Sequence, residues 1–362
     1  MPATSPQLTD PWMLGPLSVP NRVLLAPLAG IGNWFVRLQA KRYGAGMAFS
    51  EMVSSHAIHH RNEKTCVEML RIDPAERRAG PTLGVHDSGI GHLSGGGGPV
   101  SIQLFGENPA IMRSAAAQVA KAGADAIDIN MGCPVRKVCK TGAGVGLLAD
   151  PERAVALARA ARAGAADAGR ELPVTVKLRS GLVAGDTSGF ELAHRLVEDA
   201  GVAAIAFHPR SAAVHHKGEP DYELAARLVQ SLPAPVILTG GLHDAARVRS
   251  AHRFTGAAAV MLARGSLGNP WLFSRLLGRC QRAPTRREVL DELSWIIERA
   301  VEHLGEARAT RYLRKFYPWY VGRLGLDPAA AKRLNESLQR AATLEQARGL
   351  LGLEPAALSG AA

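Results

Sequence analysis

Short apolar segments rich in β-branched residues recur up to about residue 262, and longer amphipathic segments separate them. Eight of the apolar segments have the length of a buried strand: Arg22–Ala26, Met47–Glu51, Val100–Leu104, Ala126–Asn130, Val174–Lys177, Ala203–Phe207, Val236–Leu238 and Ala258–Leu262. Continuous apolar strands that alternate with helices indicate parallel strands covered on both faces. We therefore predict an α/β protein built as a closed (β/α)₈ TIM barrel, with an open doubly wound sheet as the alternative.

The segments outside the predicted strands carry helix signals. Asn108, Asp150 and Asn269 each precede a proline, which places a capping side chain before proline at the first helical position. From about Thr285 the strand pattern stops, and three amphipathic segments predict helices over 286–304, 308–320 and 328–340. We therefore place a barrel at residues 12–280 and a small C-terminal all-helical domain at 281–350. The glycine-rich segment 80–98 cannot bury apolar area, and we expect a mobile insertion near the barrel mouth.

The charge balance bears on the partner. The net charge is +11, which indicates a polyanionic partner. Residues 275–340 hold 14 Lys and Arg against 8 Asp and Glu, and so carry more than half of the excess positive charge. We interpret this segment as a contact for a polyanion, and a solvated helical face is the other interpretation. No apolar run reaches the ~18 residues of a membrane span, residues 1–10 show no secretory signal, and the four cysteines form no CxxC pair. We expect a cytoplasmic protein with no membrane, no metal and no obligate protein partner.

Residues able to do chemistry or to hold a ligand stand at the C-terminal end of nearly every predicted strand. In chain order they are Pro27 and Leu28 (apolar, beyond the first strand), Glu51, Gln103, Asn130 with Cys133, Lys177 with Arg179, His208 with Arg210, Gly240 with Gly241, and Arg264 with Gly265. One such residue alone is more often structural. In a TIM barrel, however, these ends meet at one mouth, where the active site lies. The last two loops suggest a phosphate site, because paired glycines let backbone N–H groups approach an anion and arginine adds a forked cation; glycines that merely turn the chain are the alternative.

Cys133 differs from the other cysteines because it lies in the loop Asn130–Pro134, directly beyond a strand end. A buried apolar role fits Cys66, Cys139 and Cys280. A thiol with an ordinary pKa near ~8.5 is mostly protonated at neutral pH and donates a proton without activation. A cysteine nucleophile needs a base, for which His208 is a candidate. General acid is our first interpretation of Cys133, and nucleophile the second.

Several motifs together resemble the tRNA-dihydrouridine synthases, and most closely their bacterial B-type branch. In chain order they are APLAG (26–30), SEM (50–52), QLFG (103–106), NMGCP (130–134), GVGLL (144–148), VKLRSG (176–181), HPR (208–210), ARGSLGNPW (263–271) and LRKFYPWY (313–320). The resemblance implies an FMN-dependent enzyme that reduces uridine to 5,6-dihydrouridine in tRNA with NADPH or NADH as reductant. It implies hydride transfer to C6 of the uracil and protonation of C5 by Cys133 from the opposite face.

The resemblance also implies roles for individual residues. Those expected at FMN are Pro27, Leu28, Gln103, Lys177, His208, Gly240, Gly241, Arg264 and Gly265; those expected at the RNA are Asn130, Arg179, Arg210, Arg308, Arg311, Arg314 and Lys315. Lys177 would stand beside the edge of the flavin, where a cation stabilises the reduced ring. The C-terminal cations, near Tyr317 and Trp319, would contact the RNA backbone.

Three departures from the family pattern and two competing functions remain; the first departure is the glycine-rich segment 80–98. Thr239 precedes Gly240-Gly241, where an Asn-Gly-acid sequence is common, and Pro209 removes a backbone N–H after His208. The opening LGPLSVPNRVLLAP also resembles old yellow enzyme, so an FMN barrel oxidoreductase acting on a small enone or a dihydroorotate-like substrate is the alternative enzyme. An RNA-binding barrel without catalysis is the alternative outside enzymes; the presence of Cys133 and Lys177 argues against it.

Overall fold

The computed structural model describes residues 6–77 and 97–353 of the 362. The described chain folds into two compact units. Residues up to Ser266, together with Leu272–Cys280, form the barrel unit, and Leu267–Trp271 together with residues from Gln281 onward form the helical unit. None of the described helices is long and apolar enough to cross a membrane.

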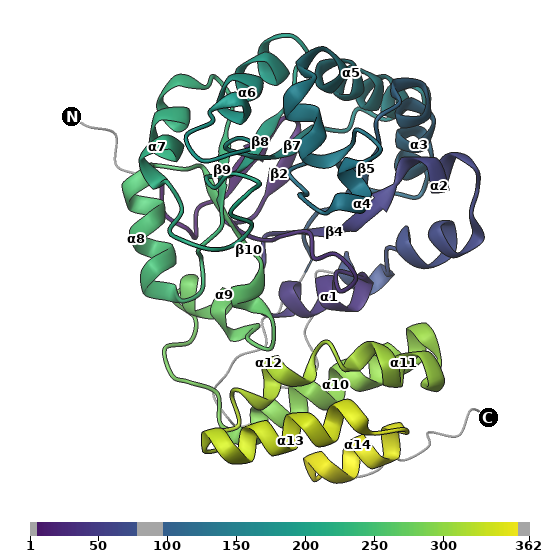
Figure 1. Ribbon diagram of the computed structural model, residues 1–362, viewed down its shortest axis with the longest axis vertical. Helices are drawn as coiled ribbons and strands as arrows, with labels where there is room; N and C mark the ends of the chain where they lie inside the picture. Colours follow the sequence, from purple (N-terminus) through teal and green to yellow (C-terminus); the bar gives the residue numbers. More distant parts are fainter. Residues whose placement is uncertain (1–5, 78–96, 354–362) are drawn as a thin grey trace. The chain divides into compact units, whose positions relative to one another are not determined.

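Eight parallel strands close into a barrel, so the predicted TIM barrel is confirmed and the open sheet is excluded (Figure 1). The strands are β3 (Val23–Leu25), β4 (Met47–Ser54), β5 (Val100–Phe105), β6 (Ala126–Met131), β7 (Val174–Arg179), β8 (Ala204–His208), β9 (Val236–Thr239) and β10 (Ala259–Leu262). The last strand closes the barrel by pairing with the first, Val260 opposite Val23. Nearly all strand residues are buried on both faces, as the continuous apolar runs predict.

Helices surround the barrel and connect its strands (Figure 1). They are α1 (Trp34–Arg42), α2 (Ser55–His59), α3 (Pro109–Lys121), α4 (Arg136–Cys139), α5 (Pro151–Asp167), α6 (Ser188–Glu198), α7 (Tyr222–Ser231) and α8 (Ala245–Thr255), followed by α9 (Trp271–Leu276). The predicted caps at Asn108 and Asp150 are present: their side chains accept the N–H of Ala110 at 2.9 Å and of Arg153 at 3.1 Å. Pro270 immediately precedes α9.

A short antiparallel hairpin, β1 (Trp12–Leu14) and β2 (Leu17–Val19), precedes the barrel and was not predicted. Its inward side chains Trp12, Leu14 and Val19 belong to one buried cluster with residues at the strand starts such as Ala126 and Ala204. The hairpin therefore closes the N-terminal end of the barrel with apolar side chains. The C-terminal end is left for a ligand.

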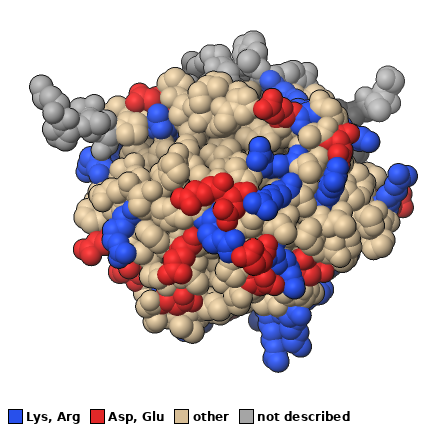
Figure 2. Space-filling view, turned by 90° about the horizontal axis from the view of Figure 1, so that it is seen from above, with Lys and Arg blue, Asp and Glu red and all other residues tan. Residues whose placement is uncertain are grey.

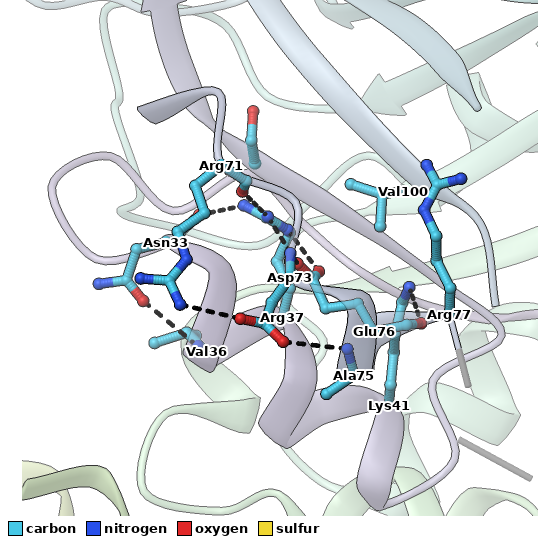
Figure 3. Close-up of polar contacts among 12 residues, drawn as sticks. Asn33, Val36, Arg37, Lys41, Arg71, Asp73, Ala75, Glu76, Arg77 and Val100 are labelled. Atoms are coloured by element: carbon cyan, nitrogen blue, oxygen red, sulfur yellow. Dashed lines mark hydrogen bonds and ion pairs between the residues drawn. The ribbon is translucent and has the colours of Figure 1, made fainter. Parts of the chain in front are cut away.

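A buried ion pair joins α1 to the short turn η2 (Pro74–Glu76) (Figure 3). Arg37 donates to both carboxylate oxygens of Glu76, at 2.8 and 2.9 Å, and both side chains are fully buried. Lys41 donates to the carbonyls of Glu76 and Gly98. Gly98 precedes β5, so these contacts lie at the N-terminal end of the barrel. The predicted insertion, residues 80–98, lies outside the described residues except for its last two.

The helical unit contains α10 (Arg286–Leu304), α11 (Glu306–Leu313), α12 (Tyr317–Val321), α13 (Pro328–Arg340) and α14 (Leu344–Leu351). The predicted helix bounds 286–304 and 328–340 are confirmed. The single helix predicted over 308–320 was wrong, because the chain breaks after Leu313. Pro318 has no N–H and its ring collides with the carbonyl of the residue four positions earlier, so a continuous helix through it is disfavoured. The last helix, α14, was not predicted.

Candidate active site at the barrel mouth

A cavity of about 330 Å³ opens at the C-terminal ends of the strands. This volume falls in the range of small-molecule and cofactor sites. Twelve of the residues singled out from the sequence line it: Pro27, Leu28, Gln103, Asn130, Cys133, Lys177, Arg179, His208, Arg210, Gly240, Gly241 and Arg264. These residues come from both ends of the barrel sequence, and barrel closure brings them together. Gly265 follows Arg264 in a short 3₁₀ turn and is buried.

The loop that carries Cys133 is held from three sides. Asn130 accepts the N–H of Cys133 at 2.9 Å, and the Cys133 carbonyl accepts the N–H of Val145 at 3.1 Å. The Sγ of Cys139 lies 3.3 Å from the same carbonyl. A side chain at Gly144, where φ is +60°, would approach that carbonyl to 2.6 Å. The Cys133 thiol itself is half-buried and faces the cavity.

Beneath the Cys133 loop lies a hydrogen-bonded group of side chains. Asn130 donates to Gln103 at 2.9 Å, and Gln103 donates to Asp128 at 2.6 Å. Thr175 donates to the other oxygen of Asp128 at 2.5 Å. The Asn130 amide is thus engaged with the protein itself, and the residue also lines the cavity; its contact with the uridine stays a prediction.

Lys177 brings the central positive charge into the cavity. Burial, and then the neighbouring Arg179, lower the pKa of Lys177 to about 8. Arg179 is fixed by its own hydrogen bonds, to the carbonyls of Gly132 at 2.9 Å, Ser211 at 3.1 Å and His215 at 2.7 Å. Arg179 therefore joins the Cys133 loop to the loop after β8, in addition to lining the cavity.

The loop after β8 presents several basic side chains. Arg210 donates twice to the carbonyl of Gly218, at 2.7 and 3.2 Å. The rings of His208 and His216 stack with centroids 5.9 Å apart. Burial is the largest cause that lowers the pKa of both, that of His208 well below its ordinary value and that of His216 to about 4. Neutral imidazoles among fixed cations leave the arginines and Lys177 as the positive charges of the site.

The glycines after β9 are in conformations that favour glycine. Gly240 and Gly241 have φ of +98° and +74°. A Cβ on Gly240 would lie 2.2 Å from the His208 ring, and one on Gly241 would lie 2.7 Å from both the Pro220 ring and the Tyr222 hydroxyl. A Cβ added to Gly265 would likewise lie 2.4 Å from the Leu242 carbonyl oxygen. With Arg264 also lining the cavity, these close backbone turns form a cradle suited to an anion.

The cavity also contains residues that the sequence analysis missed. Met52, Leu242, His215, His216 and His243 line it. The adjacent pair His215-His216, shortly after a strand end, was a visible signal. Asp128 was missed too, although a carboxylate inside a strand predicted to be buried is itself a signal of a buried polar network.

The four cations predicted to contact RNA lie in the helical unit and differ in exposure. Arg308, Arg311 and Lys315 are exposed, with Lys315 beyond the end of α11 and 5.0 Å from the Tyr312 ring centroid. Arg314 is half-buried and donates to the carbonyl of Ala341 at 3.1 Å, so it packs within the unit.

On the face shown in Figure 2, basic and acidic side chains are interspersed and no broad area of one sign is formed.

Comparisons with known proteins agree with the motifs. The family model "Dihydrouridine synthase (Dus)" matches residues 24–355. The chain is similar to a probable tRNA-dihydrouridine synthase 1 of Synechocystis sp., at 33% identity over 94% of this chain and 88% of the relative. It is also similar to tRNA-dihydrouridine synthase B of Pseudomonas aeruginosa, at 34% identity over 86% of this chain and 87% of the relative.

Among solved structures, the chain is similar to an old yellow enzyme homologue from Zymomonas mobilis, with a TM-score of 0.54 and 18% identity over 76% of this chain and 94% of that one. The chain is also similar to morphinone reductase in complex with tetrahydroNAD, with a TM-score of 0.50 and 18% identity over 78% of this chain and 94% of that one. At this identity the likeness concerns the barrel fold alone.

Proposed function

The chain belongs to the dihydrouridine synthase family, and from that premise we propose that it reduces uridine to 5,6-dihydrouridine in tRNA, using FMN and either NADPH or NADH. The observation that carries the proposal is one cavity that holds a loop cysteine, a buried lysine and a glycine cradle with arginine beside it. A small-molecule oxidoreductase of the same fold needs neither the cysteine loop nor exposed cations on a separate helical unit.

The residues present fit FMN. The turns at Gly240, Gly241 and Gly265, with Arg264, would hold the phosphate, because close backbone turns and a forked cation suit an anion. Lys177 would stand beside the ring, with His208 and Gln103 next to it, and Pro27 and Leu28 would pack against it. When bound, FMN supplies the hydride that reaches C6 of the uracil, after the nicotinamide has supplied it in turn.

Cys133 is proposed as the general acid that protonates C5 of the uracil. Its loop is fixed through Asn130, Val145 and Arg179, so the thiol is held at the cavity wall before substrate binds. Fixed placement of a proton donor is what a general acid requires. Arg210, whose guanidinium is anchored on Gly218, would add positive charge on the RNA side.

We propose the helical unit as the tRNA-binding part of the chain. Arg308, Arg311 and Lys315 are its exposed candidates for phosphate contact, and Arg314 would support them by packing on Ala341. Other exposed cations, Lys332, Arg333 and Arg340, lie on α13.

The test is reconstitution of the purified protein with FMN and NADPH or NADH, followed by incubation with unmodified tRNA. We expect dihydrouridine, mapped by mass spectrometry, at defined tRNA positions, and loss of the same modification from cells that lack the gene. Reduction of a cyclic enone with no reduction of tRNA would favour the small-molecule alternative. RNA binding with no flavin uptake would favour the non-catalytic one.

A further inference from the structure

We infer that Asp128, a carboxylate buried inside the barrel, is a positioning residue for Cys133. It sets the direction of a chain of side-chain amides that ends on the backbone N–H groups of the Cys133 loop. The catalytic meaning of this placement rests on the proposed function of Cys133; the placement itself does not.

The chain of hydrogen bonds crosses three neighbouring strands, β5, β6 and β7. Asp128 Oδ1 accepts the Thr175 hydroxyl at 2.5 Å, and Oδ2 accepts Gln103 Nε2 at 2.6 Å. Gln103 Oε1 accepts Asn130 Nδ2 at 2.9 Å. Asn130 Oδ1 then accepts the N–H of Cys133 at 2.9 Å and that of Gly132 at 3.2 Å.

The two ends of this chain fix its direction. An ionised carboxylate only accepts hydrogen bonds, so Gln103 must turn its NH₂ toward Asp128 and its oxygen toward Asn130. Backbone N–H groups only donate, so Asn130 must turn its oxygen toward the Cys133 loop and its NH₂ toward Gln103. Both ends therefore require the same orientation of both amides, and reversing one amide would set donor against donor at one neighbour and acceptor against acceptor at the other.

Burial makes this direction consequential. Asp128, Gln103 and Thr175 are fully buried, so a group that loses its partner there has no water to replace it. Burial raises the pKa of Asp128 to about 6, so most of the carboxylate is ionised at neutral pH. Asn130 is 9% exposed, at the boundary between this core and the cavity. A disturbance at Asp128 is therefore passed on to Asn130, the residue in contact with the loop.

A second role for Asp128 is as the counter-charge of Lys177. Opposite charge raises the pKa of Lys177, against the larger effects of burial and Arg179 that lower it. The two roles make different demands. Direction of the amide chain depends on which atoms of Asp128 accept, whereas charge compensation depends only on its negative charge.

The experiment uses the full chain labelled with ¹⁵N-cysteine, which has four backbone N–H signals, one for each cysteine. Amide hydrogen exchange is measured in wild type, Asp128→Asn, Gln103→Glu and the double variant Gln103→Glu/Asp128→Asn. Cys139 and Cys66, whose N–H groups donate to the carbonyls of Val135 and Asn62, are internal references. Asp125→Asn is the matched control, because Asp125 precedes the same strand and accepts a backbone N–H from Val100 outside the chain.

In Asp128→Asn, the new amide either leaves the Thr175 hydroxyl without an acceptor or turns the chain around. Exchange at Cys133 should rise by about fivefold to tenfold, the loss of one neutral hydrogen bond, with the reference amides unchanged. Gln103→Glu alone places two carboxylates together, so one of them must take up a proton. As the pH rises and this proton is lost, exchange at Cys133 should increase relative to exchange at the reference amides.

The double variant restores the direction. The carboxylate introduced at position 103 would accept from Asn130 and from the amide introduced at position 128, whose oxygen would accept from Thr175. Exchange at Cys133 should therefore return to near the wild-type rate, and this restoration is the result that a merely structural role would not produce.

Several outcomes would contradict the inference. Unchanged exchange at Cys133 in both Asp128→Asn and Gln103→Glu overturns it, as does an equal rise at all four cysteines. A rise of the same size in Lys177→Met would instead assign Asp128 to charge compensation. Failure of the wild type to reduce tRNA would remove the proposed function and leave these exchange results standing.

Discussion

Nη1 of Arg210 lies 3.2 Å from Nε2 of His208 inside the cavity. A guanidinium can only donate, so Nε2 accepts and the ring carries its single proton on Nδ1. His208 is 5% exposed, and burial followed by the charges of Lys177, Arg179 and Arg210 lowers its pKa well below 6.5. The folded protein therefore holds this imidazole neutral.

A pH dependence of stability follows from the neutral His208. Below the ordinary histidine pKa of about 6.5, the unfolded chain binds a proton that the folded protein does not. The stability that the neutral His208 contributes is therefore present above pH 6.5, and it is lost as the pH falls toward the pKa of His208 in the folded protein. The free energy of unfolding, measured with urea at pH 7 and pH 5, should fall less in His208→Gln than in wild type. Equal losses in the two proteins would show that His208 takes up a proton freely when folded.

Lys177 should give cofactor binding an alkaline limit. With a pKa of about 8, Lys177 loses its charge above that pH, and the edge of the flavin ring then loses its cationic partner. The Kd for FMN, followed by quenching of flavin fluorescence, should rise above pH 8 by at most about tenfold per pH unit. Lys177→Met should bind FMN more weakly at pH 7 and lack this bend, while Lys121→Met, on the exposed end of α3, should keep it. A bend that persists in Lys177→Met belongs to another group.

The glycine cradle can be tested with alanine. Gly241→Ala places a Cβ 2.7 Å from Pro220 and Tyr222 at a φ of +74°, so FMN affinity should fall by about tenfold or more. Gly169→Ala is the control, because Gly169 has a similar φ of +70° with nothing within 4 Å of the added atom. The control shares the backbone strain and lies outside the cavity, so its FMN affinity should equal that of wild type. Equal losses in both would indicate general destabilisation.

Cys133→Ala should slow uridine reduction by about 10² to 10⁴-fold, the usual range for a general acid. FMN binding and flavin reduction by NADPH should stay near wild type, because neither needs a proton on C5. Cys139→Ala removes a neighbouring thiol whose contact is with the Cys133 carbonyl, so its effect should be much smaller. Single-turnover oxidation of reduced enzyme by tRNA measures the step. Full activity of Cys133→Ala would rule out the acid.

The exposed cations of the helical unit should set the salt dependence of tRNA binding. Changing Arg308, Arg311 and Lys315 to Ala should weaken affinity and lower the slope of log K against log salt by roughly 0.7 to 0.9 per lost contact. NADPH-driven flavin reduction should not change. The control removes the same charge from exposed positions on the outer barrel helices, Lys121, Arg159 and Arg253 to Ala. A slope that changes equally in both triple variants reflects net charge and no specific contact.

The strand pattern was readable because parallel barrel strands are buried on both faces and leave continuous apolar runs, as at Ala259–Leu262. The helices at 286–304 and 328–340 carry their own signals, an amphipathic period and local caps at Thr285 and Asp327. Such signals reside within a few residues. The break in the helix after Leu313 also had a local signal, Pro318. The prediction followed the amphipathic period across residues 308–320 and did not take this proline into account.

The sequence alone therefore determined the alternating strands, the helical segment and the residues that stand at the strand ends, because each depends on neighbours in sequence. The pairing of the last strand with the first, which closes the barrel and brings those residues together, came from the tertiary structure. Only the tertiary structure decided how those residues are used. Asp128 lies under Gln103 and Asn130 because adjacent strands are in register, with Gln103 opposite Asp128 and Asn130 opposite Lys177. Arg314 packs on Ala341 while Arg311 stays exposed. Hydrogen-bond partners and burial are properties of contacts between distant segments, and no local pattern records them.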